Sequence, residues 1–299
     1  MPRSRFDVAG RTVFITGAAR GIGAAAARRL HAGGANIALV GLEPQRLQAL
    51  ADRLGPRAAW FEADVTDYDA LQRAVEGTIA RFGAIDVAIA NAGLMFIGRL
   101  ATAPREQVER TLEVNLLGVW RTNRAVLDEI VRNRGYLLNI ASLSAASHTP
   151  LMGAYTASKA GVEAMTDCLR VELAPTGARV GCAYFGFIDT DLVKASFAHT
   201  STQALTSVMP GFVARPAPLS EAIDAIERGV TRRSARIWAP RYVGAALALR
   251  GVLQPLTELR LQRSRQLPRA LTLADPPSGG VSDEHAQLGV AAEAAAERR

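Results

Sequence analysis

Residues 11–23 read R-T-V-F-I-T-G-A-A-R-G-I-G, and this stretch decides the fold. The opening run R-T-V-F-I-T is β-branched and aromatic, which is typical of a buried strand. An alanine-rich helix pattern follows from Ala24. Between the two lie Gly17, Gly21 and Gly23. Such a turn lets the backbone approach a pyrophosphate, which the helix N-terminus attracts through its free N–H groups and dipole. The spacing Gly-x-x-x-Gly-x-Gly is not the Gly-x-Gly-x-x-Gly fingerprint, so a plain glycine turn is the alternative.

The alternation of strand and helix continues along the chain. Short apolar runs indicate further strands, and amphipathic or capped segments between them indicate helices. The expected strands are 11–16, 36–40, 58–63, 86–90, 136–140, 179–184 and 235–239. Because βα units alternate six times, we predict an α/β fold, with one Rossmann-like, doubly wound parallel sheet of about seven strands and helices on both faces.

The charge of the chain is concentrated in one segment. Of the 299 residues, 49% are hydrophobic and 21% are charged, and the formal net charge is +7. Residues 240–270 hold six arginines and one acid, Glu258, so they account for most of that charge. The rest of the chain is nearly balanced, which predicts no groove for nucleic acid.

Neither a membrane span nor a metal site is expected. No window approaches the ~18 apolar residues that a spanning helix needs, and the N-terminus lacks the apolar core of a secretory signal. Cys168 and Cys182 lie in apolar settings, which favours buried free thiols and a cytoplasmic protein. The four histidines are scattered without ligand spacing, so we expect no bound metal.

A Tyr-x-x-x-Lys pair, Tyr155 and Lys159, lies in a predicted helix that begins at Ala154, and Ser142 stands thirteen positions before the tyrosine. Residues i and i+4 share a helix face, so the two polar tips meet. A free phenol has a pKa near ~10, and an adjacent ammonium lowers it, which suits proton transfer to or from a hydroxyl or carbonyl. Taken alone, the pair is more typical of a solvated helix face than of a catalytic site.

Polar residues follow two other strands. Asp64-Val65 ends the third strand, and Asn91-Ala92-Gly93 ends the fourth, at the sheet edge where parallel sheets bind ligands. A strand-ending turn is the alternative for the second group. Asn115 interrupts the apolar face of the next helix, where an asparagine is usually a satisfied core residue.

Together these motifs resemble those of the short-chain dehydrogenase/reductase family in order and spacing, over about residues 8 to 240. The resemblance implies an NAD(P)-dependent enzyme that interconverts an alcohol and a ketone or aldehyde. It implies that Tyr155 is the general acid/base, that Ser142 hydrogen-bonds the substrate oxygen, and that Lys159 holds the nicotinamide ribose and lowers the tyrosine pKa. Asn115 would anchor a water that links Lys159 to solvent. These donors converge where charge develops on the carbonyl oxygen, while the cofactor carries the hydride.

The resemblance also implies the cofactor contacts, which run along the sheet edge from the pyrophosphate to the nicotinamide. The implied residues are Thr16, Gly17, Arg20, Gly21, Ile22 and Gly23 for the pyrophosphate and adenosine, Glu43 for the ribose, Asp64 and Val65 for the adenine, Asn91, Ala92 and Gly93 for the ribose side, and Tyr155, Lys159, Gly186, Ile188 and Thr190 for the nicotinamide end.

Two departures from the family pattern bear on the cofactor. The chain has Phe185-Gly186 where Pro-Gly is usual, so the nicotinamide-side loop gains a backbone N–H. The acid typical of NAD enzymes would fall at Gly41, and the arginine typical of NADP enzymes at Leu42. Arg20 could meet a 2′-phosphate, whereas Glu43 would repel it or bind ribose hydroxyls. We expect NADP ahead of NAD, because the carboxylate is displaced from its usual position.

The connection from Asp189 to Pro218 is long and apolar, and segments of this length are functional or disordered. It contains Phe197, Met209 and Phe212. In the family this segment closes over substrate. Its composition favours a hydrophobic alcohol or ketone, such as a steroid-, retinoid- or lipid-like molecule.

Beyond Pro240 the resemblance fades. Residues 241–266 form a basic amphipathic helix pattern, with Pro255 interrupting it. We interpret it as a helix over the substrate mouth or at a subunit interface, and peripheral membrane contact through 241–266 is the alternative. We therefore predict three segments: a catalytic domain (1–240), a basic helical extension (241–274) and a disordered tail (275–299).

The predicted function is thus that of an NADP- or NAD-dependent oxidoreductase, forming a homodimer or homotetramer as its family does. Two rivals remain at this point. One is a nucleotide-binding regulatory protein without turnover, and the other is a reductase that processes lipids at a membrane surface.

Overall fold

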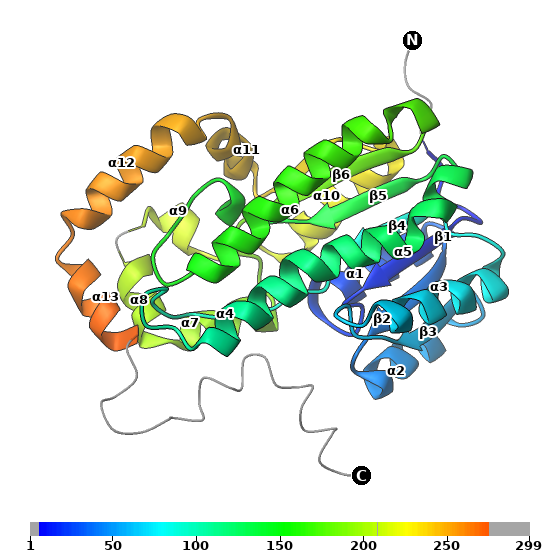
Figure 1. The fold of residues 1–299 in the computed structure, drawn as a ribbon, viewed down its shortest axis with the longest axis horizontal. Coiled ribbons are helices and arrows are strands. Elements are labelled where there is room, and N and C mark those ends of the chain that lie inside the picture. The colour runs from blue at the N-terminus through cyan, green and yellow to red at the C-terminus, as the bar shows by residue number, and fades with distance from the viewer. Residues whose placement is uncertain (1–5, 208, 275–299) are drawn as a thin grey trace.

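A computed structural model describes residues 6–207 and 209–274. Its centre is a seven-stranded sheet in the order β3-β2-β1-β4-β5-β6-β7, and every neighbouring pair is parallel (Figure 1). The strands are β1 (Thr12–Thr16), β2 (Asn36–Gly41), β3 (Ala58–Glu62), β4 (Val87–Ala90), β5 (Tyr136–Ile140), β6 (Arg179–Phe185) and β7 (Arg236–Ala239). The predicted α/β fold and all seven strands are confirmed.

Helices cover both faces of the sheet because its strands are apolar on both sides. Every residue of β1, β4 and β5 is buried, as expected of strands inside a parallel sheet. One core cluster joins the sheet to α1 (Gly21–Ala32), α2 (Pro44–Leu54) and α10 (Leu219–Arg232). A second cluster on the opposite face joins it to α3 (Tyr68–Phe82) and α5 (Gly118–Arg132). The doubly wound arrangement follows from this division.

The strand order reverses between β1 and β4, so the crevice outside their carboxyl ends is the expected ligand site. Side-chain hydrogen bonds cap the N-termini of helices near this crevice. Asp67 caps α3 by accepting a hydrogen bond from the Ala70 N–H at 3.0 Å. On the far side of the crevice α6 (Gly153–Glu172) carries the Tyr-x-x-x-Lys pair.

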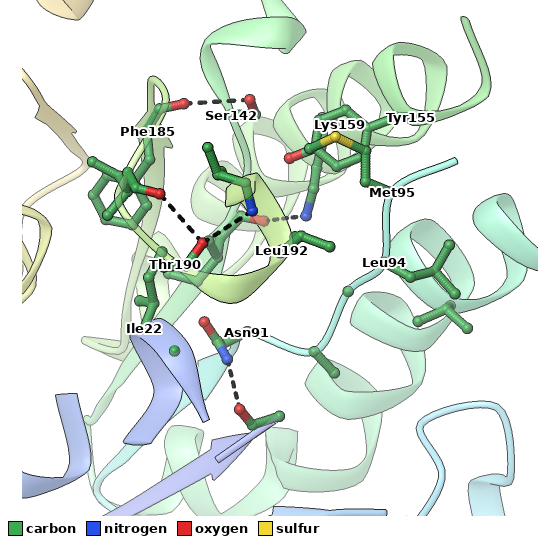
Figure 2. A pocket seen from close by; sticks show the side chains of 18 of the residues that line it. Ile22, Asn91, Leu94, Met95, Ser142, Tyr155, Lys159, Phe185, Thr190 and Leu192 are labelled. Carbon is green, nitrogen blue, oxygen red and sulfur yellow. Dashed lines mark hydrogen bonds between the residues drawn. The ribbon is translucent and has the colours of Figure 1, made fainter. Parts of the chain in front are cut away.

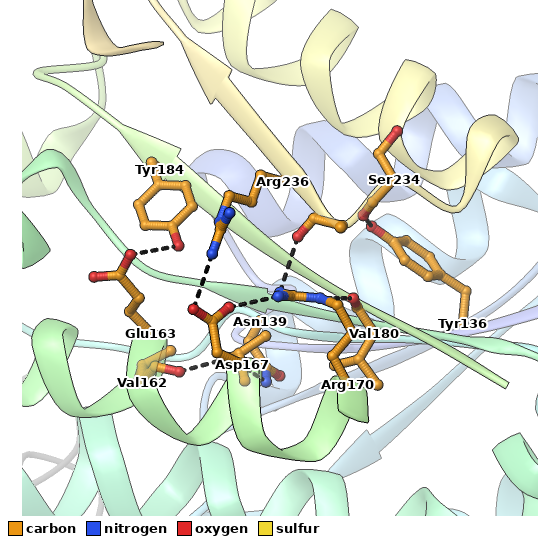
Figure 3. Close-up of polar contacts among 12 residues, drawn as sticks. Tyr136, Asn139, Val162, Glu163, Asp167, Arg170, Val180, Tyr184, Ser234 and Arg236 are labelled. Carbon is orange, nitrogen blue, oxygen red and sulfur yellow. Dashed lines mark hydrogen bonds and ion pairs between the residues drawn. The ribbon is translucent and has the colours of Figure 1, made fainter. Parts of the chain in front are cut away.

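Polar contacts join α6 to the β6–β7 edge of the sheet (Figure 3). Asp167 pairs with Arg170 on its own helix and with Arg236 on β7. The Arg170 guanidinium also donates to the carbonyls of Val180 and Ala235 at 2.8 and 3.0 Å. One helical turn before Asp167, buried Glu163 accepts a hydrogen bond from the Tyr184 hydroxyl. These contacts fix the helix that carries Tyr155 and Lys159.

The connection from 189 to 218 is largely helical, although its sequence suggested an irregular segment. It forms α7 (Asp191–Ala198), α8 (Thr200–Thr206) and α9 (Gly211–Ala214). Thr190 caps α7, accepting from the Val193 N–H at 3.4 Å. The Phe197 ring packs edge-on against Phe187 with 4.9 Å between centroids, which holds α7 against the loop after β6.

The C-terminal segment forms three helices, α11 (Arg241–Ala248), α12 (Arg250–Gln262) and α13 (Gln266–Ala274). The predicted interruption at Pro255 is wrong, because this proline lies inside α12 and the break falls at Leu249. α13 packs against α8. Among the described residues no helix is both long and apolar enough to cross a membrane. The predicted tail, 275–299, lies outside the described residues.

Candidate active site

A cavity of about 500 Å³ opens at the carboxyl ends of the strands. Ser142, Tyr155 and Lys159 line it together with the glycine turn after β1 (Figure 2). Ser142 stands two residues beyond β5, whereas the tyrosine and lysine come from α6. The fold therefore gathers side chains from separate segments around one space, as the motif spacing predicted.

Hydrogen bonds hold the serine and the lysine in place. The Ser142 hydroxyl donates to the Phe185 carbonyl at 3.3 Å and accepts from the Ser144 N–H at 3.1 Å. The Lys159 Nζ donates to the Ile140 carbonyl at 2.8 Å and lies 5.7 Å from the centre of the Tyr155 ring. Tyr155 and Lys159 are 8% and 4% exposed, so neither belongs to a solvated helix face.

The expected lowering of the Tyr155 pKa is not what this geometry produces. Burial raises the pKa of Tyr155, and a hydrogen bond with the Ser142 side chain acts in the opposite direction. Burial also lowers the pKa of Lys159, to about 8, with the buried Cys182 acting weakly against it. The ammonium is committed to a main-chain carbonyl and lies beside the ring, which explains why it does not dominate the phenol.

Asn115 lies in a π-helical turn, Glu113–Leu117, between α4 (Arg105–Leu112) and α5. Its amide donates to the Leu94 carbonyl and accepts from the Leu94 N–H, both at 2.8 Å. It also donates to the Ser158 hydroxyl at 3.3 Å. Asn115 is fully buried and does not line the cavity, so it joins the loop after β4 to the catalytic helix. Helical irregularities of this kind are frequent at functional sites.

The glycine turn brings the β1 end close to the loop after β4. Gly17 has a φ of +63°, and a Cβ there would lie 2.8 Å from the Cα of Ala92. A Cβ on Gly23 would lie 2.3 Å from the Gly17 carbonyl oxygen. The Asn91 side chain donates to the carbonyls of Thr16 and Gly17 at 3.0 and 3.1 Å, which fixes the turn. Thr16 and Gly23 therefore support the turn from behind, while Gly17, Gly21 and Ile22 face the cavity.

The N-terminus of α1 fits a bound anion. Its first turn contains no acidic residue, and no side chain caps it. The extended Arg20 precedes it, and Gly21 adopts a φ of +56°. Free N–H groups and a positive dipole end at a glycine-lined cavity are what a nucleotide pyrophosphate needs.

Two arginines neutralise the carboxylate at the adenosine end. Glu43 pairs with Arg20 at 3.0 Å and with Arg46 at 3.1 Å. The Arg46 contact is absent from the sequence prediction, although its position three residues after Glu43 on α2 is the usual spacing for such a pair. The Glu43 group thus consists of two positive charges and one negative charge, of which Arg20 and Glu43 line the cavity.

The adenine and ribose residues expected from the sequence, Asp64, Val65, Asn91, Ala92 and Gly93, all line the cavity. Burial favours a raised pKa for Asp64, but hydrogen bonds from Thr66 and the nearby Arg110 outweigh it, so its pKa lies below the ordinary value. A Cβ on Gly93 would approach the Asn115 Oδ1 at 3.1 Å and the Lys159 Nζ at 3.6 Å. A side chain at this position would therefore press on the Asn115 amide, which would have to shift by a few tenths of an ångström.

The loop after β6 closes the other end of the cavity, where Gly186, Ile188 and Thr190 line the wall. Phe185, which replaces the usual proline, is 4% exposed and packs into the core. The Gly186 N–H donates to the Ala239 carbonyl at 2.9 Å. Phe185 therefore packs into the core and also contributes to the wall of the cavity.

Several apolar side chains at the catalytic end were not foreseen. They are Met95, Leu143, Met152, Phe187 and Leu192. Met95 directly follows the N-A-G-L run, so its place after a strand could have indicated it. The others come from loops and from α7, whose positions no local pattern reveals. Of the lid residues named from the sequence, Met209 lines the cavity, whereas Phe212 is 65% exposed.

Known proteins share both the sequence pattern and the fold. The family model of the short chain dehydrogenases matches residues 11–201. An uncharacterized oxidoreductase of Myxococcus xanthus is 32% identical over 264 residues, which cover 85% of this chain and 98% of that protein. A trans-4-hydroxycyclohexanecarboxylate dehydrogenase of Sinomonas cyclohexanicum is 31% identical over 201 residues, or 64% of this chain and 78% of that protein.

Among solved structures, an alcohol dehydrogenase from the archaeon Thermococcus sibiricus, complexed with 5-hydroxy-NADP, matches with a TM-score of 0.65 and 27% identity. The match covers 76% of this chain and 95% of that chain. Because the family model spans well over half of the sequence and the fold agrees with it, this chain belongs to the short-chain dehydrogenase/reductase family of NAD(P)-dependent oxidoreductases.

Proposed function

We propose that this enzyme interconverts a hydrophobic alcohol and its ketone or aldehyde with NADP(H), and that Tyr155 is the general acid/base. The observation that carries the proposal is the convergence of Ser142, Tyr155 and Lys159 on a cavity that also contains the glycine turn. If the three side chains and the anion-binding turn were purely structural, there would be no reason for them to lie at the same cavity.

The roles of the side chains follow from their chemistry. NADP(H) held by its pyrophosphate at the glycine turn would supply or accept the hydride through its nicotinamide. In the oxidative direction the Tyr155 phenolate takes the proton of the substrate hydroxyl, and in the reductive direction the phenol returns it. The Ser142 hydroxyl donates a hydrogen bond to the same oxygen as it becomes a carbonyl. The Lys159 ammonium, which donates to the Ile140 carbonyl, offers its remaining protons to ribose hydroxyls.

The apolar wall supports a hydrophobic substrate. Met95 and Met152 share a cluster with the Tyr155 ring, and Leu192 packs against it from α7. Leu261 and Ala270, from α12 and α13, belong to the same cluster. Burying apolar substrate surface here contributes roughly 25 cal/mol per Å². Steroid-, retinoid- and lipid-like alcohols or ketones are the proposed class.

The charge at the adenosine end supports NADP over NAD. Because Arg20 and Arg46 both pair with Glu43, the group carries a net positive charge despite its carboxylate. A 2′-phosphate would gain charge-assisted hydrogen bonds from the two guanidinium groups. We also propose a cytoplasmic location and a homodimer or homotetramer, for which the exposed Leu117 and Trp120 near and on α5 offer an apolar contact.

The test is a turnover assay with NADPH or NADH and a panel of hydrophobic ketones, comparing the enzyme with Tyr155→Phe. We expect the loss of the phenol to lower kcat by about 10²- to 10⁴-fold, the usual contribution of a general acid. NADPH should be the better donor. Tyr68→Phe is the matched control, because within the described part of the chain this hydroxyl accepts a hydrogen bond from Gln72 on α3, and its loss should leave turnover unchanged.

Full turnover by Tyr155→Phe would remove the proposed acid/base. Tight binding of NADPH with no turnover of any ketone or alcohol would instead favour the rival regulatory protein. The complete catalytic set speaks against that rival, because loss of activity usually leaves a missing member.

A further inference from the structure

The face that α12 turns to solvent is apolar. Leu249, Val252, Leu253, Leu256 and Leu259 are 55%, 63%, 40%, 57% and 43% exposed. Their spacings of three and four residues place them on one side of the helix, as a stripe about 15 Å long at ~1.5 Å per residue. Single exposed leucines are ordinary, but a contiguous apolar stripe marks a contact surface.

The opposite face of α12 binds the enzyme through polar side chains, with Leu261 packed inward near the end of the helix. The Arg250 guanidinium donates to the Glu163 carboxylate of α6 at 2.8 Å. The Gln254 side chain accepts from the His148 N–H at 2.8 Å and donates to the His148 carbonyl at 3.2 Å. This reverses the usual amphipathic arrangement, in which the apolar face packs inward. Polar contacts therefore fix α12 with its leucines outward.

The stripe lies in a strongly basic surface. Arg241, Arg260, Arg263, Arg265 and Arg269 are exposed, and none of them pairs with an acid among the described residues. Within 241–274 the only acid is Glu258, which accepts a hydrogen bond from Gln254. Arg260 and Arg263 continue the apolar stripe by the same helical spacing.

We propose that the outer face of α12 docks onto an anionic lipid bilayer, with the leucines at the headgroup boundary and the arginines on lipid phosphates. Arginine stems can lie along apolar surface while their guanidinium groups reach the phosphates. Figure 1 shows α12 at the outer edge of the molecule, where a flat surface can approach it. A second copy fits less well, because pairing two such faces brings like charges together.

This proposal goes beyond the redox function and does not depend on it. The experiment is co-sedimentation of the full chain with vesicles of phosphatidylcholine, with and without about 30% phosphatidylserine. We expect binding to the anionic vesicles that weakens as salt is raised. The double variant Val252→Glu/Leu256→Glu should bind at least about tenfold more weakly. Each of Arg260→Gln and Arg263→Gln should weaken binding about fivefold.

Val171→Glu is the matched control, because Val171 is 74% exposed on α6 and should leave vesicle binding unchanged. NADPH binding by every variant checks that the fold is retained. Equal pelleting of the double variant and the parent chain would overturn the proposal. So would a chain that ignores anionic vesicles but is dimeric in analytical ultracentrifugation, with the double variant monomeric, because the face would then join two copies.

Discussion

Lys159 is a charged side chain held where a neutral one would be more stable. It is 4% exposed and its ammonium has one described hydrogen bond, to the Ile140 carbonyl. Burial lowers its pKa from 10.5 to about 8, so folding carries a penalty for keeping it protonated at neutral pH. Proteins accept such penalties at sites where function requires the charge.

The variant Lys159→Met should be more stable than the parent at pH 7 and far less active. The shift in pKa corresponds to about 3 kcal/mol, and the lost hydrogen bond offsets about 1 kcal/mol, so we expect a gain of about 2 kcal/mol. Below pH 8 the lysine is charged in both states and the parent bears the whole penalty. Between pH 8 and 10.5 the lysine is protonated only in the unfolded chain. The free energy of unfolding of the parent therefore rises with pH, and its difference from that of the variant becomes smaller.

Urea unfolding of both proteins at pH 7 and pH 9.5 measures this difference. A methionine variant that is less stable at pH 7, or a gap that stays constant with pH, would contradict the account of Lys159. Turnover of the variant should fall at least about 100-fold if the ammonium takes part in the reaction.

For these individual residues, the sequence predicts which side chains meet but not the direction in which their pKa values shift. The separation of Tyr155 from Lys159 follows from helix geometry alone. The direction of the Tyr155 pKa depends on how deeply α6 is buried and on where the Lys159 Nζ points, which no spacing encodes. The pair of Glu43 with Arg46 has a local spacing that could have indicated it, whereas the pair of Glu43 with Arg20 joins two separate segments.

In the strand–turn–helix unit of β1 and α1, the close packing of the backbone leaves no room for larger side chains in the turn. The turn holds its shape because the backbones of Gly17 and Gly23 touch and because Asn91 bonds to both Thr16 and Gly17. Any side chain at Gly23 must displace the turn, since its Cβ would meet a main-chain oxygen at 2.3 Å and the Asn91 Nδ2 at 2.6 Å.

Gly23→Ala should therefore weaken NADPH binding by at least about tenfold, because the displaced turn no longer presents its N–H groups to the pyrophosphate. Fluorescence titration with NADPH measures the affinity. Gly211→Ala is the control, since a Cβ there meets nothing within 4 Å. An alanine at 23 that leaves the affinity unchanged would show that the turn does not hold the nucleotide.

Elements set by local pattern were predictable, and those set by tertiary packing were not. β5 begins and ends at the residues predicted from its apolar run, Tyr136 and Ile140. The helices of the 189–218 connection depend on the packing of α8 against α13, about sixty residues further along the chain. Pro255 was expected to interrupt the helical pattern, yet it lies inside α12, because the packed helix tolerates the loss of one backbone hydrogen bond.

For the molecule as a whole, the question is whether the basic extension is a separate unit. The boundary at 240 predicted from the sequence suggests so, but α12 is tied to the catalytic helix. Glu163, which is 9% exposed, accepts hydrogen bonds from Tyr184 on β6 and from Arg250 on α12. Removing Arg250 leaves this carboxylate with one partner, so we expect the substitution to destabilise the core of the sheet.

Arg250→Met should therefore lower the free energy of unfolding by about 1 kcal/mol, a modest value because Arg250 is half exposed. Tryptophan fluorescence during urea unfolding is the measurement, since the three tryptophans, Trp60, Trp120 and Trp238, all precede the extension. If the extension folds with the catalytic domain, their single transition shifts to lower urea. Arg260 lies on the same helix and has no acidic partner among the described residues, so Arg260→Met should leave the urea midpoint of the transition unchanged. An unshifted transition for Arg250→Met would mean that the extension folds independently of the sheet.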